Sequence, residues 1–134
     1  MPKATRSIDT KHFDLKSLPP NPDTGEEGGW VKLRQMSYEE VLERRSFTSD
    51  MKVKQGQGQK DFEGVLQLMN KNATIFEFNA CIVEHNLQGE DDKLLDFSKP
   101  STLKLLDPRV GEEISRYIDE LNQFDEAGDE ELGN

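Results

Sequence analysis

The amino-acid sequence predicts a mainly α domain with a small N-terminal β-hairpin, an α+β fold in which the hairpin precedes three principal helices and one short helix. Three observations lead to this prediction. Helix-start signals stand at residues 37–40 and 107–108, an apolar repeat with alternating steps of four and three residues runs through residues 62–87, and two alternating stretches flank a loop rich in proline and glycine. The first two observations are typical of helices, and the third is typical of a hairpin.

The hairpin is expected near the N-terminus. The stretches "KHFDLKSL" (residues 11–18) and "WVKLRQM" (residues 30–36) both alternate apolar and polar side chains, and residues 19–29 between them hold three prolines and three glycines. Alternation with a period of two predicts strands that bury one face. A loop of this length leaves the register of the two strands weakly specified.

The first helix has an explicit start signal in Ser37 and Glu40, which form a capping box, S-x-x-E. In such a box each of the two side chains accepts a hydrogen bond from the main-chain amide of the other residue. The signal predicts a helix near residues 37–51, with Tyr38, Val41 and Leu42 facing inward. Residues 54–60 then break the pattern with two glycines in a polar setting, which is typical of a flexible joint.

The last helix is expected over residues 107–124. Asp107 is a favourable N-cap, and Pro108 suits the first helical position, where its missing amide costs nothing. A short helix is expected just before it, near residues 101–106, because Pro100 stands where that helix would begin. The predicted buried face of the last helix consists of Val110, Ile114, Tyr117, Ile118, Leu121 and Phe124.

The longest helix is expected over residues 61–87. Its predicted core stripe is Phe62, Leu66, Met69, Ala73, Phe76, Ala80, Val83 and Leu87. A second apolar group lies well round the helical cylinder at about 100° per residue and consists of Leu68, Ile75, Phe78 and Ile82. A helix that is apolar on two faces is either central in its domain or offers one face to a partner, and both interpretations stay open at this point.

Length and charge set the organisation of the chain. Its 134 residues predict a single domain over residues 11–124, with a disordered N-terminus (1–10) and a disordered acidic tail (125–134). Residues 1–60 contain 11 Lys and Arg against 9 Asp and Glu, a net charge of +2, and residues 61–134 contain 6 against 18, a net charge of −12. This acidic excess argues against nucleic-acid binding, which depends on neutralising phosphates, and it favours solubility or a basic partner.

The sequence offers no signal for a membrane or a secretory route. No apolar run approaches the roughly 18 residues of a membrane span, and the N-terminus lacks the apolar core of a signal peptide. We therefore expect a cytoplasmic protein that does not bind membranes.

Catalytic, cofactor and metal sites are not expected either. His12 and His85 lie far apart, and Cys81 stands among apolar neighbours, so these residues form no set of metal ligands and no nucleophile with its base. The sequence therefore predicts a protein that is not an enzyme. Arg44 and Arg45 belong to a mildly basic region, which is either a solvated helix face or a contact for an acidic partner.

The order of the segments resembles the tail assembly chaperones of long-tailed (siphovirus-type) bacteriophages and prophages. The resemblance covers residues 11–124 and rests on "GGWVKLRQMSYEEVLERR", a long helix ending in "FEFNACIVEHNL", an acidic turn, "LDFSKP" and "LDPRVGEEISRYIDELN". It implies a non-enzymatic factor that binds the tape-measure protein and keeps it soluble until tail-tube protein replaces it. The resemblance also implies a location in the infected bacterial host and absence from the mature virion. Many members of the family are made in a short and a longer, frameshifted form, and we propose this chain as the short form.

Partner contacts are expected on apolar side chains that the core does not need. The hypothesis assigns Leu68, Ile75, Phe78 and Ile82, with Arg44 and Arg45, to the tape-measure protein or to self-association. The alternative function, of a different class, is a structural tail-completion or connector protein of the virion. Presence or absence in purified particles discriminates between the two.

Overall fold

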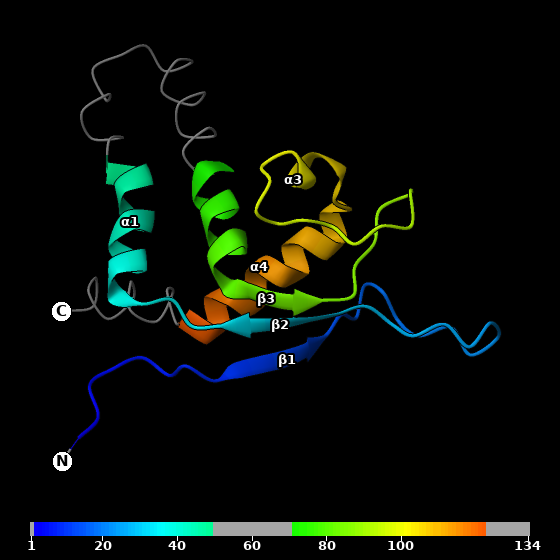
Figure 1. Cartoon of the computed structure of the whole chain (residues 1–134), viewed down its shortest axis with the longest axis horizontal. Coiled ribbons are helices and arrows are strands. Elements are labelled where there is room, and N and C mark those ends of the chain that lie inside the picture. Colours follow the sequence, from blue (N-terminus) through cyan, green and yellow to red (C-terminus); the bar gives the residue numbers. More distant parts are fainter. Residues whose placement is uncertain (1, 50–70, 123–134) are drawn as a thin grey trace, which may run out of the picture.

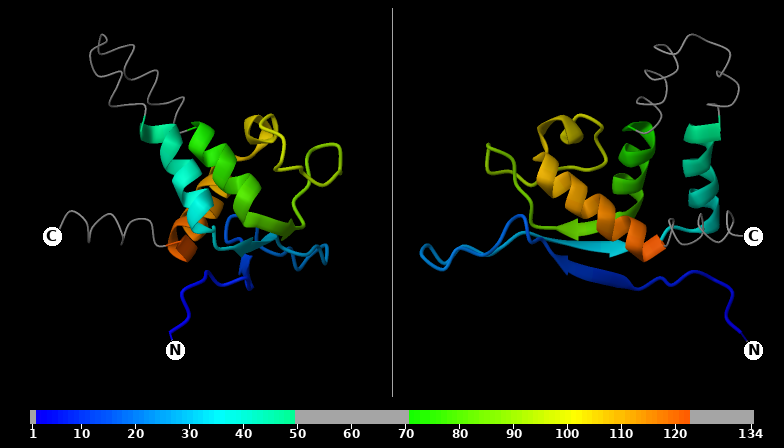
Figure 2. Two further views of the ribbon diagram at one scale, coloured as in Figure 1. Left: turned by 60° about the vertical axis from the view of Figure 1, so that its left-hand side comes forward. Right: turned by 180° about the vertical axis from the view of Figure 1, so that it is seen from behind.

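The computed structural model describes residues 2–49 and 71–122. In this part of the chain, four helices, three of them substantial, pack with a three-stranded antiparallel sheet, so the predicted α+β class is confirmed. Figures 1 and 2 show the helices gathered on one side of the sheet. The elements in chain order are β1 (Thr10–Asp14), β2 (Trp30–Arg34), α1 (Tyr38–Ser49), a helical segment over residues 71–81, β3 (Ile82–His85), α3 (Thr102–Leu105) and α4 (Pro108–Asn122).

The strand β2 is the centre of the sheet. It pairs antiparallel with β1, which confirms the predicted hairpin, and its other edge pairs antiparallel with β3. Val31 and Leu33 of β2 are fully buried, because they belong to the same core cluster as the buried residues of α4. Lys32 points to the opposite face and pairs there with Glu84 of β3, with 3.4 Å between Nζ and Oε2.

The prediction of one helix over residues 61–87 is wrong at its C-terminal end. Residues 71–81 are helical, but residues 82–85 form β3, and residues 61–70 lie outside the described part of the chain. The strand forms because β2 offers an open edge of main-chain donors and acceptors, and because β-branched Ile82 and Val83 suit an extended strand. The alternating steps of four and three residues are therefore not a property of one helix.

The buried face of segment 71–81 also differs from the predicted stripe. Ala73, Glu77, Phe78 and Cys81 are buried, which is a spacing of about one helical turn, whereas Val83 is 53% exposed on β3. Of the predicted stripe, Ala73 and Leu87 are buried and Phe76 and Ala80 pack against the core, and the second apolar group adds Phe78 and Ile82. The core therefore draws on both groups, and Val83 leaves it because residues 82–85 form a strand.

The helix α1 starts as predicted but packs differently. The amide of Ser37 donates to Glu40 Oε1 at 3.0 Å, and the amide of Glu40 donates to Ser37 Oγ at 3.2 Å, so the capping box is formed. Val41 packs against the core, but Tyr38 is 71% exposed and Leu42 is 45% exposed. The prediction that these two side chains face inward is wrong, because α1 meets the rest of the domain along a narrow stripe.

The helix α4 follows its predicted pattern. Asp107 caps it by accepting from the amide of Arg109 at 2.9 Å, and the predicted short helix α3 precedes it. Val110, Ile114 and Ile118 of α4 are buried. They form one core with β2 and segment 71–81, whose largest fully buried side chains are Phe78, Leu33, Ile114, Ile118, Val31 and Cys81.

The sequence predicts disorder at both ends of the chain, over residues 1–10 and 125–134. The predicted acidic tail (125–134) and Phe124 lie outside the described residues. Residues 2–9 carry no regular element, and Arg6 lies against the end of β2, where its guanidinium donates to the carbonyl of Gln35 at 2.8 Å.

Candidate partner-binding surfaces

The apolar residues proposed for partner binding do not form one exposed stripe. Phe78 is 2% exposed and meets the ring of Phe97 edge to face, with 5.9 Å between the ring centroids. Ile82 lies on β3 opposite Leu33 and packs against the core, and Ile75 is half-buried on segment 71–81. Leu68 lies outside the described residues. Phe78 is therefore a core residue and Ile82 packs against the core, so the four residues do not form the separate apolar face that the hypothesis supposes.

The two arginines of α1 have different surroundings. The Nε of Arg44 donates to the carboxylate of Glu77, which is 3% exposed, so Arg44 joins α1 to segment 71–81. Arg45 is exposed on the same helix. Arg44 is thus a structural ion-pair partner, and Arg45 is the one of the two that faces solvent.

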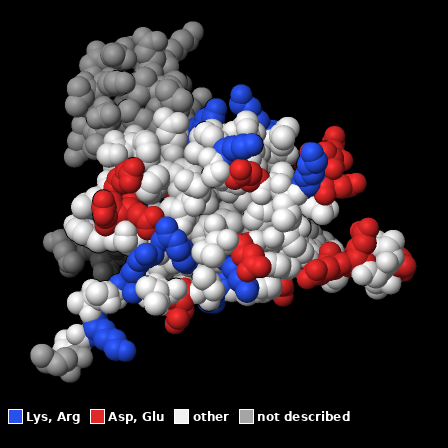
Figure 3. Space-filling view, in the orientation of Figure 1, with Lys and Arg blue, Asp and Glu red and all other residues white. Residues whose placement is uncertain are grey.

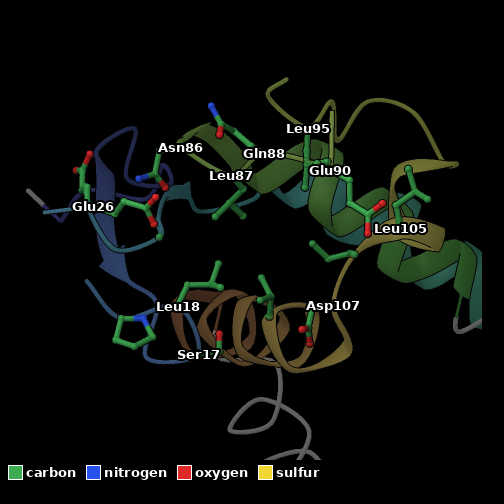
Figure 4. Close-up of a pocket in the computed structure, with 16 residues that line it drawn as sticks. Ser17, Leu18, Glu26, Asn86, Leu87, Gln88, Glu90, Leu95, Leu105 and Asp107 are labelled. Carbon is green, nitrogen blue, oxygen red and sulfur yellow. The ribbon is translucent and has the colours of Figure 1, made fainter. Parts of the chain in front are cut away.

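A pocket of about 460 Å³ lies at the other end of the domain, and we call it the loop pocket (Figure 4). Three connections form it, namely the one between β1 and β2, the one that follows β3, and the one between α3 and α4. Figure 4 shows Leu18 and Leu87 on opposite walls, with Leu95 beside them. The residues that line it are Ser17, Leu18, Pro19, Glu26, Glu27, Gly29, Asn86, Leu87, Gln88, Gly89, Glu90, Leu95, Leu105, Leu106, Asp107 and Val110.

Asn86 ties two walls of the loop pocket together. Its Oδ1 accepts from the amide of Trp30 at 2.8 Å, and its Nδ2 donates to the carbonyl of Gly28 at 2.9 Å. The two ends of the β1–β2 connection meet at Gly29, whose amide donates to the carbonyl of Leu18 at 2.8 Å. A Cβ on Gly29 would lie 2.8 Å from Leu18 Cδ1, so a larger residue there would displace the pocket wall.

Glu113 anchors the β1–β2 connection to α4. Its carboxylate is 3% exposed and accepts four hydrogen bonds, from the amide of Lys16 at 2.7 Å, from the amide and hydroxyl of Ser17 at 2.9 and 2.7 Å, and from the hydroxyl of Tyr117 at 2.6 Å. Burial opposes ionisation, but these donors outweigh it and lower the pKa of Glu113 to about 2. The same contact raises the pKa of Tyr117 to about 12. The buried charge is therefore fully satisfied, and it holds the chain just before Leu18.

Acidic side chains border the loop pocket. Figure 4 places Glu26 at one end and Glu90 and Asp107 toward the other, with Leu18, Leu87 and Leu95 between them and Leu105 beyond Glu90. Figure 3 shows two groups of mainly acidic residues, one of which includes a basic side chain, at the end of the domain where Figure 1 places the β1–β2 connection and the connection after β3, with uncharged surface between them. None of the described residues that line the pocket is a lysine or an arginine. The pocket therefore combines apolar walls with a negative rim.

The side chains with reactive potential are occupied in structural roles. Burial lowers the pKa of His85, whose Nδ1 accepts from the amide of Leu87 at 3.0 Å and whose ring meets Phe97 edge to face at 4.9 Å. Burial raises the pKa of the Cys81 thiol to about 12. Among the described residues, no group of three or more His, Cys, Asp or Glu side chains is placed to hold a metal ion. No helix in the same part of the chain is long and apolar enough to cross a membrane.

Sequence reasoning missed the loop pocket, because the β1–β2 connection that forms one wall lies about 60 to 90 residues before the segments that form the others. Two local signals point to it in retrospect. Gly28 and Gly29 mark a close approach of two chain segments, and Leu105 is an exposed leucine on a helix of one turn.

Comparisons of the chain with protein-family models, with curated proteins and with solved structures find no match.

Proposed function

We propose that this protein is a tail assembly chaperone of long-tailed bacteriophages, which binds the tape-measure protein and keeps it soluble during tail-tube assembly. It acts by binding alone, without catalysis, cofactor or metal. It works in the cytoplasm of the infected host and leaves the assembly before the virion is complete.

The observation that carries this proposal is the order of segments over residues 11–124, which resembles that family from the hairpin to the last helix. The net charge of −10 is in keeping with it, because like charges on the chaperone keep its complex with an aggregation-prone client dispersed. Large apolar side chains exposed at several separate places are also in keeping with a client-binding role. The most exposed are Ile8, Leu105, Tyr38 and Leu94, at 82%, 79%, 71% and 62%.

The test is co-expression with the tape-measure protein encoded in the same tail-gene cluster. We expect the tape-measure protein to stay in the supernatant and to co-purify with this chain, and to precipitate when it is expressed alone. A charge-matched control protein, expressed in place of this chain, should not keep the tape-measure protein soluble.

Mass analysis of mature particles separates the proposal from its rival. A chaperone should be absent from purified virions. A tape-measure protein that is equally soluble alone, or this chain present in virions in a fixed ratio, would contradict the proposal and favour a structural tail-completion or connector protein.

A further inference from the structure

We infer that the loop pocket is the client-docking site, and that it takes a client segment in which a large apolar side chain stands between lysines or arginines. The identity of the client rests on the proposed function. The position of the site and the chemistry of its occupant rest on the described residues alone.

The first step concerns the apolar walls of the pocket. Its volume of about 460 Å³ lies within the roughly 300–1,000 Å³ of protein binding sites. Among the lining residues, Leu87 and Val110 are buried, at 4% and 3% exposure, whereas Leu18 and Leu105 are open to solvent, at 38% and 79% exposure. Covering these two leucines removes apolar surface from water, and an apolar side chain of a partner does this best.

The second step concerns charge. Glu26 and Glu27 lie on one side of the mouth and Glu90 on the other, and all three are exposed. Asp107 is paired with Arg109, at 3.2 Å between Oδ2 and Nη2, so the uncompensated charge at the mouth comes chiefly from the three glutamates. A segment with lysine or arginine on both sides of its apolar residue meets opposite charge at both ends of the pocket. An acidic segment of the same hydropathy is repelled there.

The third step concerns rigidity. Asn86 joins the β1–β2 connection to the chain after β3, and Glu113 joins the same connection to α4. The amide of Leu95 donates to the carbonyl of Leu87 at 2.9 Å and holds the remaining wall. Because the walls are already ordered, a bound segment loses only its own freedom, and a single side chain can serve as an anchor.

The experiment uses overlapping synthetic peptides that tile the tape-measure protein, with binding to the full chain measured by fluorescence anisotropy. We expect the peptides that bind to carry a large apolar residue between lysines or arginines, and their affinity to fall as salt is raised. Replacing those basic residues with glutamate should abolish binding.

Two variants of the pocket provide the decisive comparison. Leu105→Asp places a charge on an exposed wall residue, and the double variant Glu26→Lys with Glu90→Lys reverses the rim. Each variant should lower the affinity for the peptides at least tenfold while leaving the circular dichroism spectrum of the protein unchanged. The rim variant should also gain affinity for the glutamate-substituted peptides, which a merely damaged protein would not do.

Matched controls come from exposed residues that do not line the pocket. Asn79→Asp lies on segment 71–81, and Glu39→Lys lies on α1, and both should bind the peptides within twofold of the unaltered chain. Unaltered binding by both pocket variants, with the client still co-purifying, would overturn the pocket and leave the proposed function in place. If neither the peptides nor the intact client bind the unaltered chain, the proposed function and the docking site both fail.

Discussion

Replacing Glu113 with glutamine should destabilise the fold, although the exchange keeps the size and shape of the side chain. The carboxylate accepts four hydrogen bonds at 2.6–2.9 Å while only 3% exposed. A glutamine retains one acceptor oxygen, and its N–H₂ group faces one main-chain amide, which loses its acceptor, and one hydroxyl, which must turn round to accept. With about 1–3 kcal/mol for the unsatisfied amide and about 1 kcal/mol for the exchanged hydroxyl contact, we expect a loss of about 2–4 kcal/mol in the free energy of unfolding.

The pH dependence gives an independent estimate of the same interaction. Glu113 has an ordinary pKa of 4.5 and a folded-state pKa of about 2. A lowered pKa means that the carboxylate stabilises the folded state above pH 4.5 and that this stabilisation is lost as the pH falls toward 2. A difference of about 2.5 pK units corresponds to about 3 kcal/mol, in the range expected for the Glu113→Gln variant.

The assay is urea unfolding followed by circular dichroism, at pH 7 and at several values down to pH 2. Glu40 titrates in the same range, because its hydrogen bonds with the Arg34 guanidinium hold its pKa at about 2, so the comparison must be between variant and unaltered chain. The two should differ by about 3 kcal/mol at pH 7 and converge near pH 2. Glu112→Gln, at the neighbouring exposed position, is the control and should change stability by less than about 0.5 kcal/mol. A Glu113→Gln variant that loses less than about 1 kcal/mol at pH 7, or that keeps the pH dependence of the unaltered chain, would refute this reasoning.

Two further predictions concern the core. Phe78→Ala should cost about 3–5 kcal/mol, because this side chain is 2% exposed and packs on Phe97, whereas Leu94→Ala, at a position 62% exposed, should cost less than about 0.5 kcal/mol. Equal urea midpoints for the two variants would show that Phe78 is not a core residue. The Cys81 thiol, with its pKa raised to about 12 by burial, should react with a disulfide reagent at pH 8 only as fast as the protein opens, and at once in denaturing urea. Rapid labelling of the folded chain would contradict its burial.

Local chemistry made several elements predictable. The capping box at Ser37 and Glu40 specifies the start of α1 through contacts three residues apart, and Asp107 with Pro108 specifies the start of α4 in the same way. The hairpin follows from alternation and from the loop rich in proline and glycine. Each of these signals depends on residues close together in the sequence, so no knowledge of the tertiary structure was needed to interpret them.

The strand β3 and the loop pocket depend on partners far away in the chain. The apolar spacing of residues 62–87 suits a helix throughout, and only the open edge of β2, about 50 residues earlier, turns residues 82–85 into a strand. The pairing of β3 with β2 holds the preceding helical segment so that Phe78 lies in the core, and it brings Asn86 to the β1–β2 connection. Glu113 has the sequence setting of an exposed helical acid, and the amides of Lys16 and Ser17 make it a buried one. The sequence by itself thus determined where most elements begin and which class of fold they build. The tertiary structure alone decided which apolar and acidic side chains are buried and which surround a pocket, because burial and main-chain pairing are properties of segments that meet only after folding.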